Sequence, residues 1–151
     1  MLSFGASKNG ALAAEAVVVF EPELAAELAF RRKRSGHLWS KMRFLSAQLL
    51  AYLEDDLWLR NARHANAMAR RLADGLAGVA GARLAQPVEA NELFVALPPG
   101  VIAALRSAGF RFYDWPAPPG VDGAVVRLVT SYDVATAEVD ALLAAARGVS
   151  G

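Results

Sequence analysis

Two features of this sequence could do chemistry: a lysine in a turn of small residues and a basic cluster. Lys8 lies in residues 5–10 (GASKNG), between two short apolar runs. A lysine that forms an imine needs its amine held at one point, and small neighbours let a flat ring approach. A solvent-exposed turn lysine gives the same pattern, so both interpretations stay open. The order of glycine, lysine and hydroxyl residues does not match a phosphate-binding loop.

The basic cluster is residues 31–34 (RRKR), at the end of a helix predicted over residues 23–33. Cations are favourable at the negative end of a helix dipole, so a solvated helix end accounts for this composition. We expect His37 and His64 to be structural.

The composition excludes several classes of function. The chain has 151 residues, no cysteine, two histidines and a formal charge of +1. It therefore has no disulfides, no cysteine-ligated metal and no thiol nucleophile, and a strongly basic nucleic-acid binder is disfavoured. The longest early aliphatic run, residues 16–20, is far too short to span a bilayer, and no targeting segment is visible. We expect a soluble cytoplasmic protein that binds neither nucleic acid nor membrane.

Hydrophobic periodicity predicts alternating strands and helices. Residues 2–4 and 16–20 are expected to be strands, the second buried on both faces, before the helix at 23–33. Ser40 is expected to cap a helix that breaks near Asp55 and continues to Leu76. The predicted elements that follow are strands at 92–97, 110–115 and 125–130 and helices at 101–108 and 136–146, the last capped by Thr136.

This order of elements predicts two parts. Residues 83–151 are expected to form a two-layer α/β domain with a mostly antiparallel sheet, in which residues 125–130 are an interior strand. The first 80 residues contain too few strands to cover the aliphatic residues 17–19. We therefore expect an exposed apolar face there, which would pack against an absent segment or a partner chain.

Several blocks of the sequence resemble one known family, in the same order along nearly the whole chain. The resemblance is carried by residues 3–10 (SFGASKNG), 15–18 (EAVV), 31–38 (RRKRSGHL), 40–48 (SKMRFLSAQ), 62–69 (ARHANAMA), 87–91 (PVEAN) and 126–130 (VRLVT). Together they resemble the low-specificity L-threonine aldolases, which are pyridoxal-phosphate enzymes of the aspartate-aminotransferase-like fold. The likeness is to the C-terminal half of such an enzyme.

The resemblance implies a domain organisation and site residues. It implies that residues 1–38 are the end of a large cofactor-binding domain, residues 39–81 connecting helices, and residues 82–151 a small C-terminal α/β domain. Lys8 corresponds to the lysine that forms the imine with the cofactor. Arg127, in the strand predicted over residues 125–130, corresponds to the arginine that binds the substrate α-carboxylate. A guanidinium can bind a carboxylate through two parallel hydrogen bonds, and without the resemblance a surface ion pair is the other interpretation of Arg127. Lys33 and Lys41 fall near basic positions that help to bind the cofactor phosphate, partly across a subunit interface. No metal is implied.

The implied activity is cleavage of L-threonine and L-allo-threonine to glycine and an aldehyde. The family's chain continues upstream, where it supplies a phosphate-binding turn, a ring-stacking aromatic residue and an acid for the pyridine nitrogen. We therefore expect little or no activity from the 151-residue chain alone. The resemblance also implies a homo-oligomer, a tetramer in the family, or association with an N-terminal half. The alternative function is a non-catalytic interaction or remnant domain.

Overall fold

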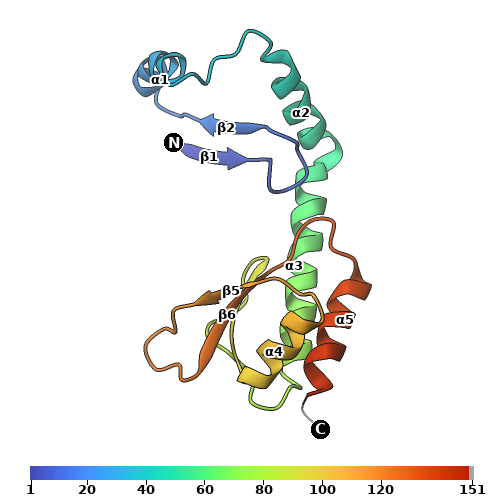
Figure 1. Ribbon diagram of the computed structural model, residues 1–151. Coiled ribbons are helices and arrows are strands. Elements are labelled where there is room, and N and C mark those ends of the chain that lie inside the picture. Colours follow the sequence, from blue (N-terminus) through green and yellow to red (C-terminus); the bar gives the residue numbers. More distant parts are fainter. Residues whose placement is uncertain (150–151) are drawn as a thin grey trace. The chain divides into compact units, whose positions relative to one another are not determined.

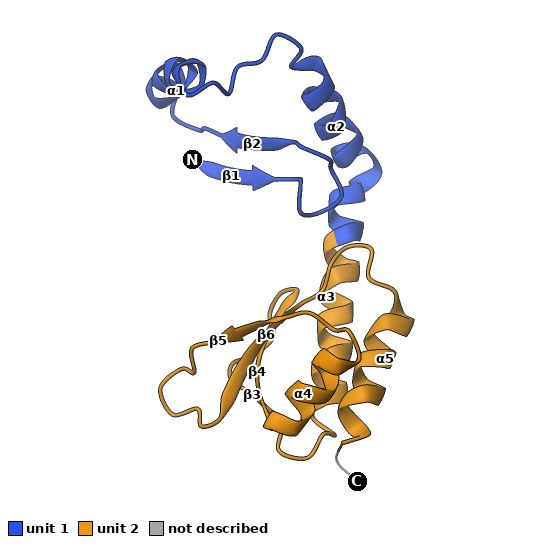
Figure 2. Cartoon of the chain, viewed as in Figure 1, with its two compact units in different colours: residues 1–61 blue, residues 62–151 orange. Residues whose placement is uncertain are grey.

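The computed structural model describes residues 1–149, which form an α/β structure (Figure 1). The chain divides into two compact units, residues 1–61 and the residues from Ala62 onward (Figure 2). Each unit has its own cluster of buried apolar side chains. None of the helices formed by residues 1–149 combines the length and apolar character that a bilayer crossing requires.

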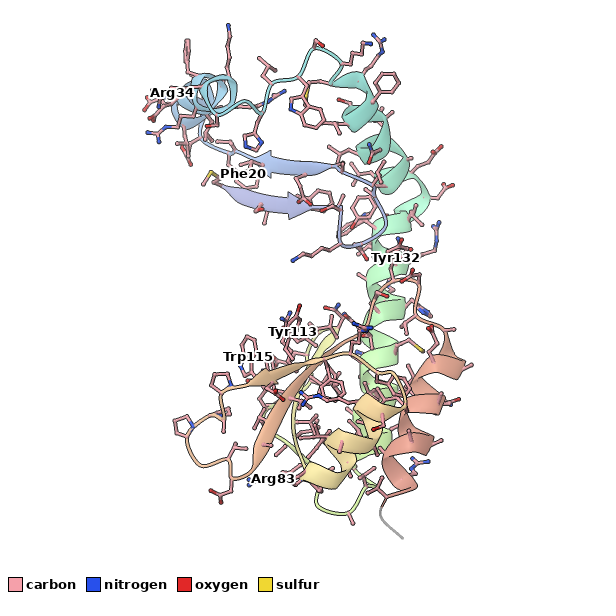
Figure 3. All side chains as sticks on the ribbon, viewed as in Figure 1. Phe20, Arg34, Arg83, Tyr113, Trp115 and Tyr132 are labelled. Carbon is pink, nitrogen blue, oxygen red and sulfur yellow. The ribbon has the colours of Figure 1, made fainter. Side chains whose placement is uncertain are left out.

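The first unit begins with a two-stranded antiparallel ribbon of β1 (Leu2–Gly5) and β2 (Glu15–Val18), in which Leu2 pairs with Val18. The prediction that residues 16–20 are buried on both faces is wrong. Val17 is 58% exposed. Phe20 is 68% exposed, and its position is labelled in Figure 3. The β-branched run still favours a strand, but β1 is its only strand partner among the described residues. The expected exposed apolar face is confirmed.

The helices of the first unit begin and end for local reasons. α1 (Pro22–Arg34) has proline in its first turn and the basic cluster in its last turn, as predicted. α2 (Arg43–Leu53) begins later than expected. Ser40 does not cap it, because Met42 occupies the N-cap position and residues 41–45 already form a turn, in which the Leu45 N–H donates to the Met42 carbonyl at 3.0 Å.

The predicted break near Asp55 is confirmed. The 3₁₀ helix η1 (Glu54–Asp56) separates α2 from α3 (Leu57–Leu76). Asp55 and Asp56 have φ angles of 49° and 56°, which lie in the left-handed region. L-residues rarely adopt this conformation, and aspartate is among the few that tolerate it. The chain therefore changes direction here without a glycine.

The second unit contains a four-stranded antiparallel sheet with the strand order β3-β4-β6-β5. The strands are β3 (Arg83–Leu84), β4 (Glu92–Leu97), β5 (Tyr113–Trp115) and β6 (Ala124–Val129), and the helices that follow α3 are α4 (Pro99–Ser107) and α5 (Thr136–Arg147). β6 lies between β4 and β5, as predicted for residues 125–130. The helices cover one face of this sheet, which makes a two-layer structure (Figure 1).

Alternating side chains build the core of the second unit. Leu93, Val95, Val126 and Leu128 of the sheet are buried against apolar residues of α3, α4 and α5. α3 and α5 approach closely at Gly75, where an added Cβ would overlap the Leu143 side chain. The residues that alternate with this buried set lie on the other face of the sheet, which the helices leave open.

Three details of the second unit differ from the predictions. Thr136 does not cap α5: Ala135 is the N-cap residue, and the Glu138 carboxylate accepts its backbone N–H at 2.7 Å. The two-residue strand β3 was not predicted, because two residues give no readable alternation. β5 is shorter than residues 110–115, since Phe110 and Phe112 pack against the core instead of pairing with β6.

Candidate active site

Lys8 lies in the turn that connects β1 and β2. The buried residues Ala6 and Ala14 close this loop, because the Ala6 N–H donates to the Ala14 carbonyl at 3.1 Å. The Ala6 carbonyl in turn accepts the N–H groups of Asn9 and Ala11, both at 3.0 Å. Three backbone hydrogen bonds therefore fix the turn, and the Lys8 side chain projects from it as an exposed group.

Side chains on both sides of Lys8 strengthen the turn. The Ser7 N–H donates to Glu15 Oε1 at 3.2 Å, and the Ser7 hydroxyl donates to the same oxygen. On the other side, Asn9 Nδ2 donates to the Trp58 carbonyl at 3.0 Å and to the Tyr52 hydroxyl oxygen. Among the described residues, Lys8 itself forms no ion pair. Its amine is therefore available on a fixed backbone.

The other two predicted lysines also lie in the first unit. Lys33 is exposed in the last turn of α1, beside a shallow pocket of about 610 Å³ that is lined by Glu27, Phe30, Arg31, Lys33 and Arg34. Lys41 is exposed in the turn before α2. No hydrogen bond within residues 1–149 joins either lysine to the Lys8 turn. Their grouping around one phosphate stays a prediction.

Arg127 lies in the second unit, on the open face of the sheet. It is opposite Phe94 of β4 and Tyr113 of β5. Its Nε donates to Glu92 Oε1, and its guanidinium carbon lies 5.4 Å from the centre of the Trp115 ring. Arg127 and Glu92 are 33% and 34% exposed, so the pair is accessible to a small molecule.

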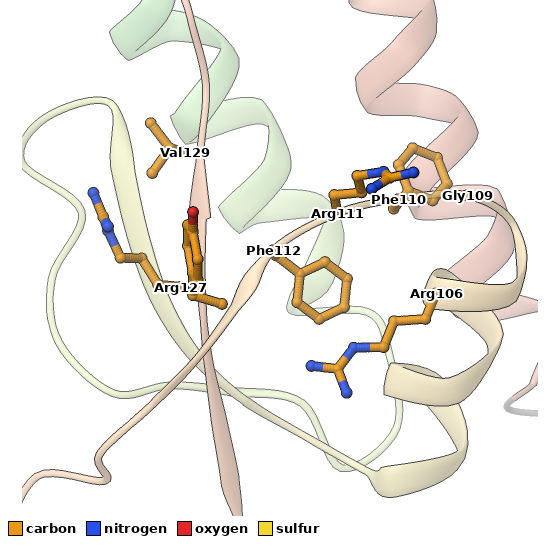
Figure 4. A pocket seen from close by; sticks show the side chains of 8 residues that line it. Arg106, Gly109, Phe110, Arg111, Phe112, Arg127 and Val129 are labelled. Carbon is orange, nitrogen blue, oxygen red and sulfur yellow. The ribbon is translucent and has the colours of Figure 1, made fainter.

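A pocket of about 760 Å³ opens beside Arg127, and its lining is basic and aromatic (Figure 4). The lining residues are Arg106, Gly109, Phe110, Arg111, Phe112, Tyr113, Arg127 and Val129. Arg106 is paired with Asp114 at 2.7 Å and lies over the Phe112 ring at 5.2 Å. Arginines on an aromatic floor suit an anion with an apolar part, such as an amino acid.

A buried threonine fixes the end of the strand that carries Arg127. Thr130 Oγ1 donates to the Ala65 carbonyl at 2.8 Å, and the Thr130 N–H donates to the Asn91 carbonyl at 2.9 Å. Asn91 Nδ2 returns a bond to the Thr130 carbonyl at 2.7 Å. His64 Nε2 lies 2.8 Å from the Val134 carbonyl oxygen. This bond gives His64 a structural role, as predicted.

Sequence reasoning did not find the residues that support the two candidates. These are Asn9 and its partner Tyr52 beside Lys8, and Glu92 and Trp115 beside Arg127. Glu92 lies diagonally across from Arg127, because residues two apart on a strand share a face and Phe94 is paired with Arg127, but the sequence does not give this strand register. For Tyr52 no signal existed either. It is 43 positions from Asn9, and no local pattern links the two.

Two curated proteins are similar in sequence to this chain. One, named low specificity L-threonine aldolase, from Pseudomonas aeruginosa, is 49% identical over 113 residues, which cover 75% of this chain and 33% of the relative. Another of the same name, from a Pseudomonas species, is 42% identical over 149 residues, which cover 99% of this chain and 42% of the relative. The chain therefore spans about two fifths or less of these relatives' length. No protein-family model matches it.

Solved structures agree with the sequence relatives. A threonine aldolase from Leishmania major superposes with a TM-score of 0.72 at 30% identity, covering 87% of this chain and 36% of that one. A glycine decarboxylase of the glycine cleavage system gives a TM-score of 0.56 at 27% identity, covering 70% of this chain and 25% of that one. The expected α/β fold class, part of the aspartate-aminotransferase-like fold, is confirmed. The chain belongs to the low-specificity L-threonine aldolase family.

Proposed function

We propose that this chain forms part of a pyridoxal-phosphate lyase that cleaves L-threonine and L-allo-threonine to glycine and an aldehyde. The proposal depends on the environment of Lys8. Its amine is exposed and has no ion-pair partner among residues 1–149, and hydrogen bonds on both sides fix the turn that carries it. Membership of the threonine aldolase family supports it.

The chemistry of the donor set fits the cofactor. Lys8 offers a primary amine for an imine, and Lys33 and Lys41 offer exposed cations for a phosphate group. When bound, pyridoxal phosphate supplies an electron sink that stabilises negative charge on the substrate's α-carbon. The domain limits at residues 38 and 81 and a cytoplasmic location stay predictions.

The reaction breaks the bond between Cα and Cβ of the substrate. Loss of the β-hydroxyl proton makes the aldehyde carbonyl, the electron pair of the broken bond stays on Cα, and a proton added there completes glycine. Arg127 binds the α-carboxylate in this proposal. By holding that group at one point it orients the bond that breaks, which is a positioning effect. Glu92 and Trp115 restrict the movement of the Arg127 guanidinium.

A chimera tests the proposed function. This chain would replace the matching 149 residues of the Pseudomonas species relative, which supplies the remainder of the enzyme. Release of acetaldehyde from threonine would be followed by a coupled reductase assay. We expect cleavage by the chimera and none by the 151-residue chain alone, whose first unit contains only two strands. A folded chimera that takes up the cofactor but releases no aldehyde would contradict the proposal.

Such a result would favour the alternative function, a non-catalytic α/β module. The observation that supports this alternative is the separate core of the second unit, which extends from Ala69 to Ala146 and draws on α3, α4, α5 and the sheet. A module of this kind would keep its fold without the cofactor or any partner.

Replacing Arg127 with lysine is expected to weaken amino-acid binding selectively. An ammonium group cannot form two parallel bonds with a carboxylate, so we expect the KM for threonine in the chimera to rise about tenfold to a hundredfold. The imine at Lys8 should still be trapped by borohydride. Arg83→Lys, on the edge strand β3, is the matched control. An unchanged KM in Arg127→Lys would remove Arg127 from the site.

We also propose that the chain acts within a homo-oligomer. Phe20, Phe30 and Trp39 of the first unit are 68%, 79% and 59% exposed. Exposed apolar side chains favour association. Sedimentation of the 151-residue chain is expected to show species larger than a monomer, and the double variant Phe20→Ser, Phe30→Ser should shift the distribution towards monomer. A monomer at every concentration would count against this proposal.

A further inference from the structure

Asn9, the residue after Lys8, uses its side-chain amide and its backbone carbonyl to bind the helices of the first unit. One amide hydrogen is donated to the Trp58 carbonyl oxygen at 3.0 Å, and the other to the hydroxyl oxygen of Tyr52. The Asn9 carbonyl oxygen accepts a hydrogen bond from Asn61 Nδ2 at 2.8 Å. These groups are partly buried, where such bonds contribute more than they do in water.

The helical partners meet at Asn9 because of the break between α2 and α3. Tyr52 lies in the last turn of α2, while Trp58 lies in the first turn of α3 and Asn61 at the start of its second turn. The left-handed residues Asp55 and Asp56 turn the chain between them. Unusual backbone of this kind persists only where the surrounding structure holds it. Here it brings three groups from two helices to one asparagine.

Aromatic packing holds the same junction. The Phe4 ring lies 5.8 Å from the Tyr52 ring and 5.6 Å, nearly edge-on, from the Trp58 ring. Phe4 belongs to β1, so the strand before the lysine turn is packed on the residues that bind Asn9. The turn therefore has an apolar anchor on its strand and a polar anchor beside Lys8.

We propose that Asn9 is a positioning residue for Lys8, which ties the lysine turn to the junction of α2 and α3 and so fixes the origin of the reactive side chain. The proposal rests on the function proposed above for Lys8. A reacting group must be held to within about 0.5 Å of its productive position. Lys8 makes no ion pair of its own within residues 1–149, so its backbone must supply that precision.

The first test uses the 151-residue chain, which contains no cysteine. A Lys8→Cys variant carries a single thiol for a nitroxide label, and its electron spin resonance spectrum reports the mobility of the turn. Adding Asn9→Asp keeps the side-chain shape but removes both donated hydrogens. The label's correlation time should then fall at least about twofold. Asn66→Asp, on α3, is the matched control and should leave the spectrum unchanged.

A second label position separates positioning from general stability. The same label at Lys33→Cys, on α1, should be unaffected by Asn9→Asp. If both labels became equally mobile, Asn9 would have only a structural role in the unit. If the label at position 8 stayed as immobile as in the parent, Asn9 would not hold the turn. Either result would overturn the inference.

The second test measures catalysis in the chimera. Asn9→Asp is expected to lower kcat at least about tenfold and to leave the KM for threonine within about twofold, because misplacement affects the reacting group rather than carboxylate binding. Tyr52→Phe removes one of the two acceptors of the Asn9 amide but keeps the ring against Phe4. We therefore expect kcat to fall less in Tyr52→Phe than in Asn9→Asp.

The activity results distinguish failure of the inference from failure of the proposed function. If Lys8→Ala kept full activity, the assignment of Lys8 would fail whatever Asn9 does. If Lys8→Ala were inactive but Asn9→Asp kept the parent kcat, the assignment of Lys8 would be supported and the positioning role of Asn9 would be wrong.

Discussion

Threonine cleavage by the chimera is expected to fall at least about a thousandfold when Lys8 is replaced by alanine, because the covalent link to the cofactor is lost. The small number of lysines in this chain simplifies the identification of the reactive amine. The chain contains three lysines, Lys8, Lys33 and Lys41. Borohydride reduction followed by peptide mass mapping distinguishes these three amines from one another and from the lysines that the relative contributes to the chimera. We expect the label on Lys8 in the parent and its loss in Lys8→Ala.

Lys8→Arg separates the chemistry of the amine from its charge. The guanidinium stays protonated and forms no imine, so this variant should be as inactive as Lys8→Ala. Lys33→Ala and Lys41→Ala should instead weaken cofactor binding and leave the mapped label on Lys8. A parent chimera that carries its label on Lys33 or Lys41 would show that the wrong lysine has been assigned.

Replacing Leu76 with alanine is expected to lower the free energy of unfolding of the second unit by about 3 to 5 kcal/mol. Leu76 is 1% exposed, at the end of α3, in the core formed with the sheet and with α4 and α5. The cost combines lost burial with a cavity that close-packed neighbours fill poorly. Since domains are stable by about 5 to 15 kcal/mol, the unit would lose much of its stability. Urea unfolding followed by circular dichroism measures the change.

Leu84→Ala is the matched control, because Leu84 of the same unit is 39% exposed, on the edge strand β3 and outside the buried core. Its effect should stay below about 1 kcal/mol. Equal unfolding midpoints for the two variants would show that α3 does not contribute to this core. The fold of the second unit would then need a different description.

The elements with strong periodic patterns could be predicted from the sequence. β4 has the bounds that were expected, and α1, α3 and β6 differ by only one or two residues at their ends. The break at Asp55 was also predicted, because three acidic residues interrupt an apolar repeat. The N-cap residues of the helices were less predictable. Ser40 and Thr136 have the right side chains, but whether such a residue caps a helix depends on where the first helical turn begins.

The site could be predicted only as far as single residues. Lys8 was singled out by its turn of small residues and given a role by the family resemblance, Arg127 was found through the resemblance alone, and both roles stay proposals. Their partners come from distant parts of the sequence: Asn9 meets Tyr52 through the turn at Asp55 and Asp56, and Arg127 meets Glu92 through strand pairing. The burial of residues 16–20 was mispredicted, because a β-branched run indicates a strand but not how many neighbouring strands surround it.

The left-handed pair between α2 and α3 limits how this sequence can evolve. At Asp55 and Asp56 the positive φ angles admit glycine, asparagine and aspartate readily, and β-branched or bulky residues only at a cost in strain. Glycine would fit the backbone but would give the unfolded chain more freedom, so it would weaken the junction entropically. We therefore expect only a few residue types to be tolerated at these two positions during evolution. An exposed corner far in sequence from Lys8 is under a constraint that its solvent exposure alone would not reveal.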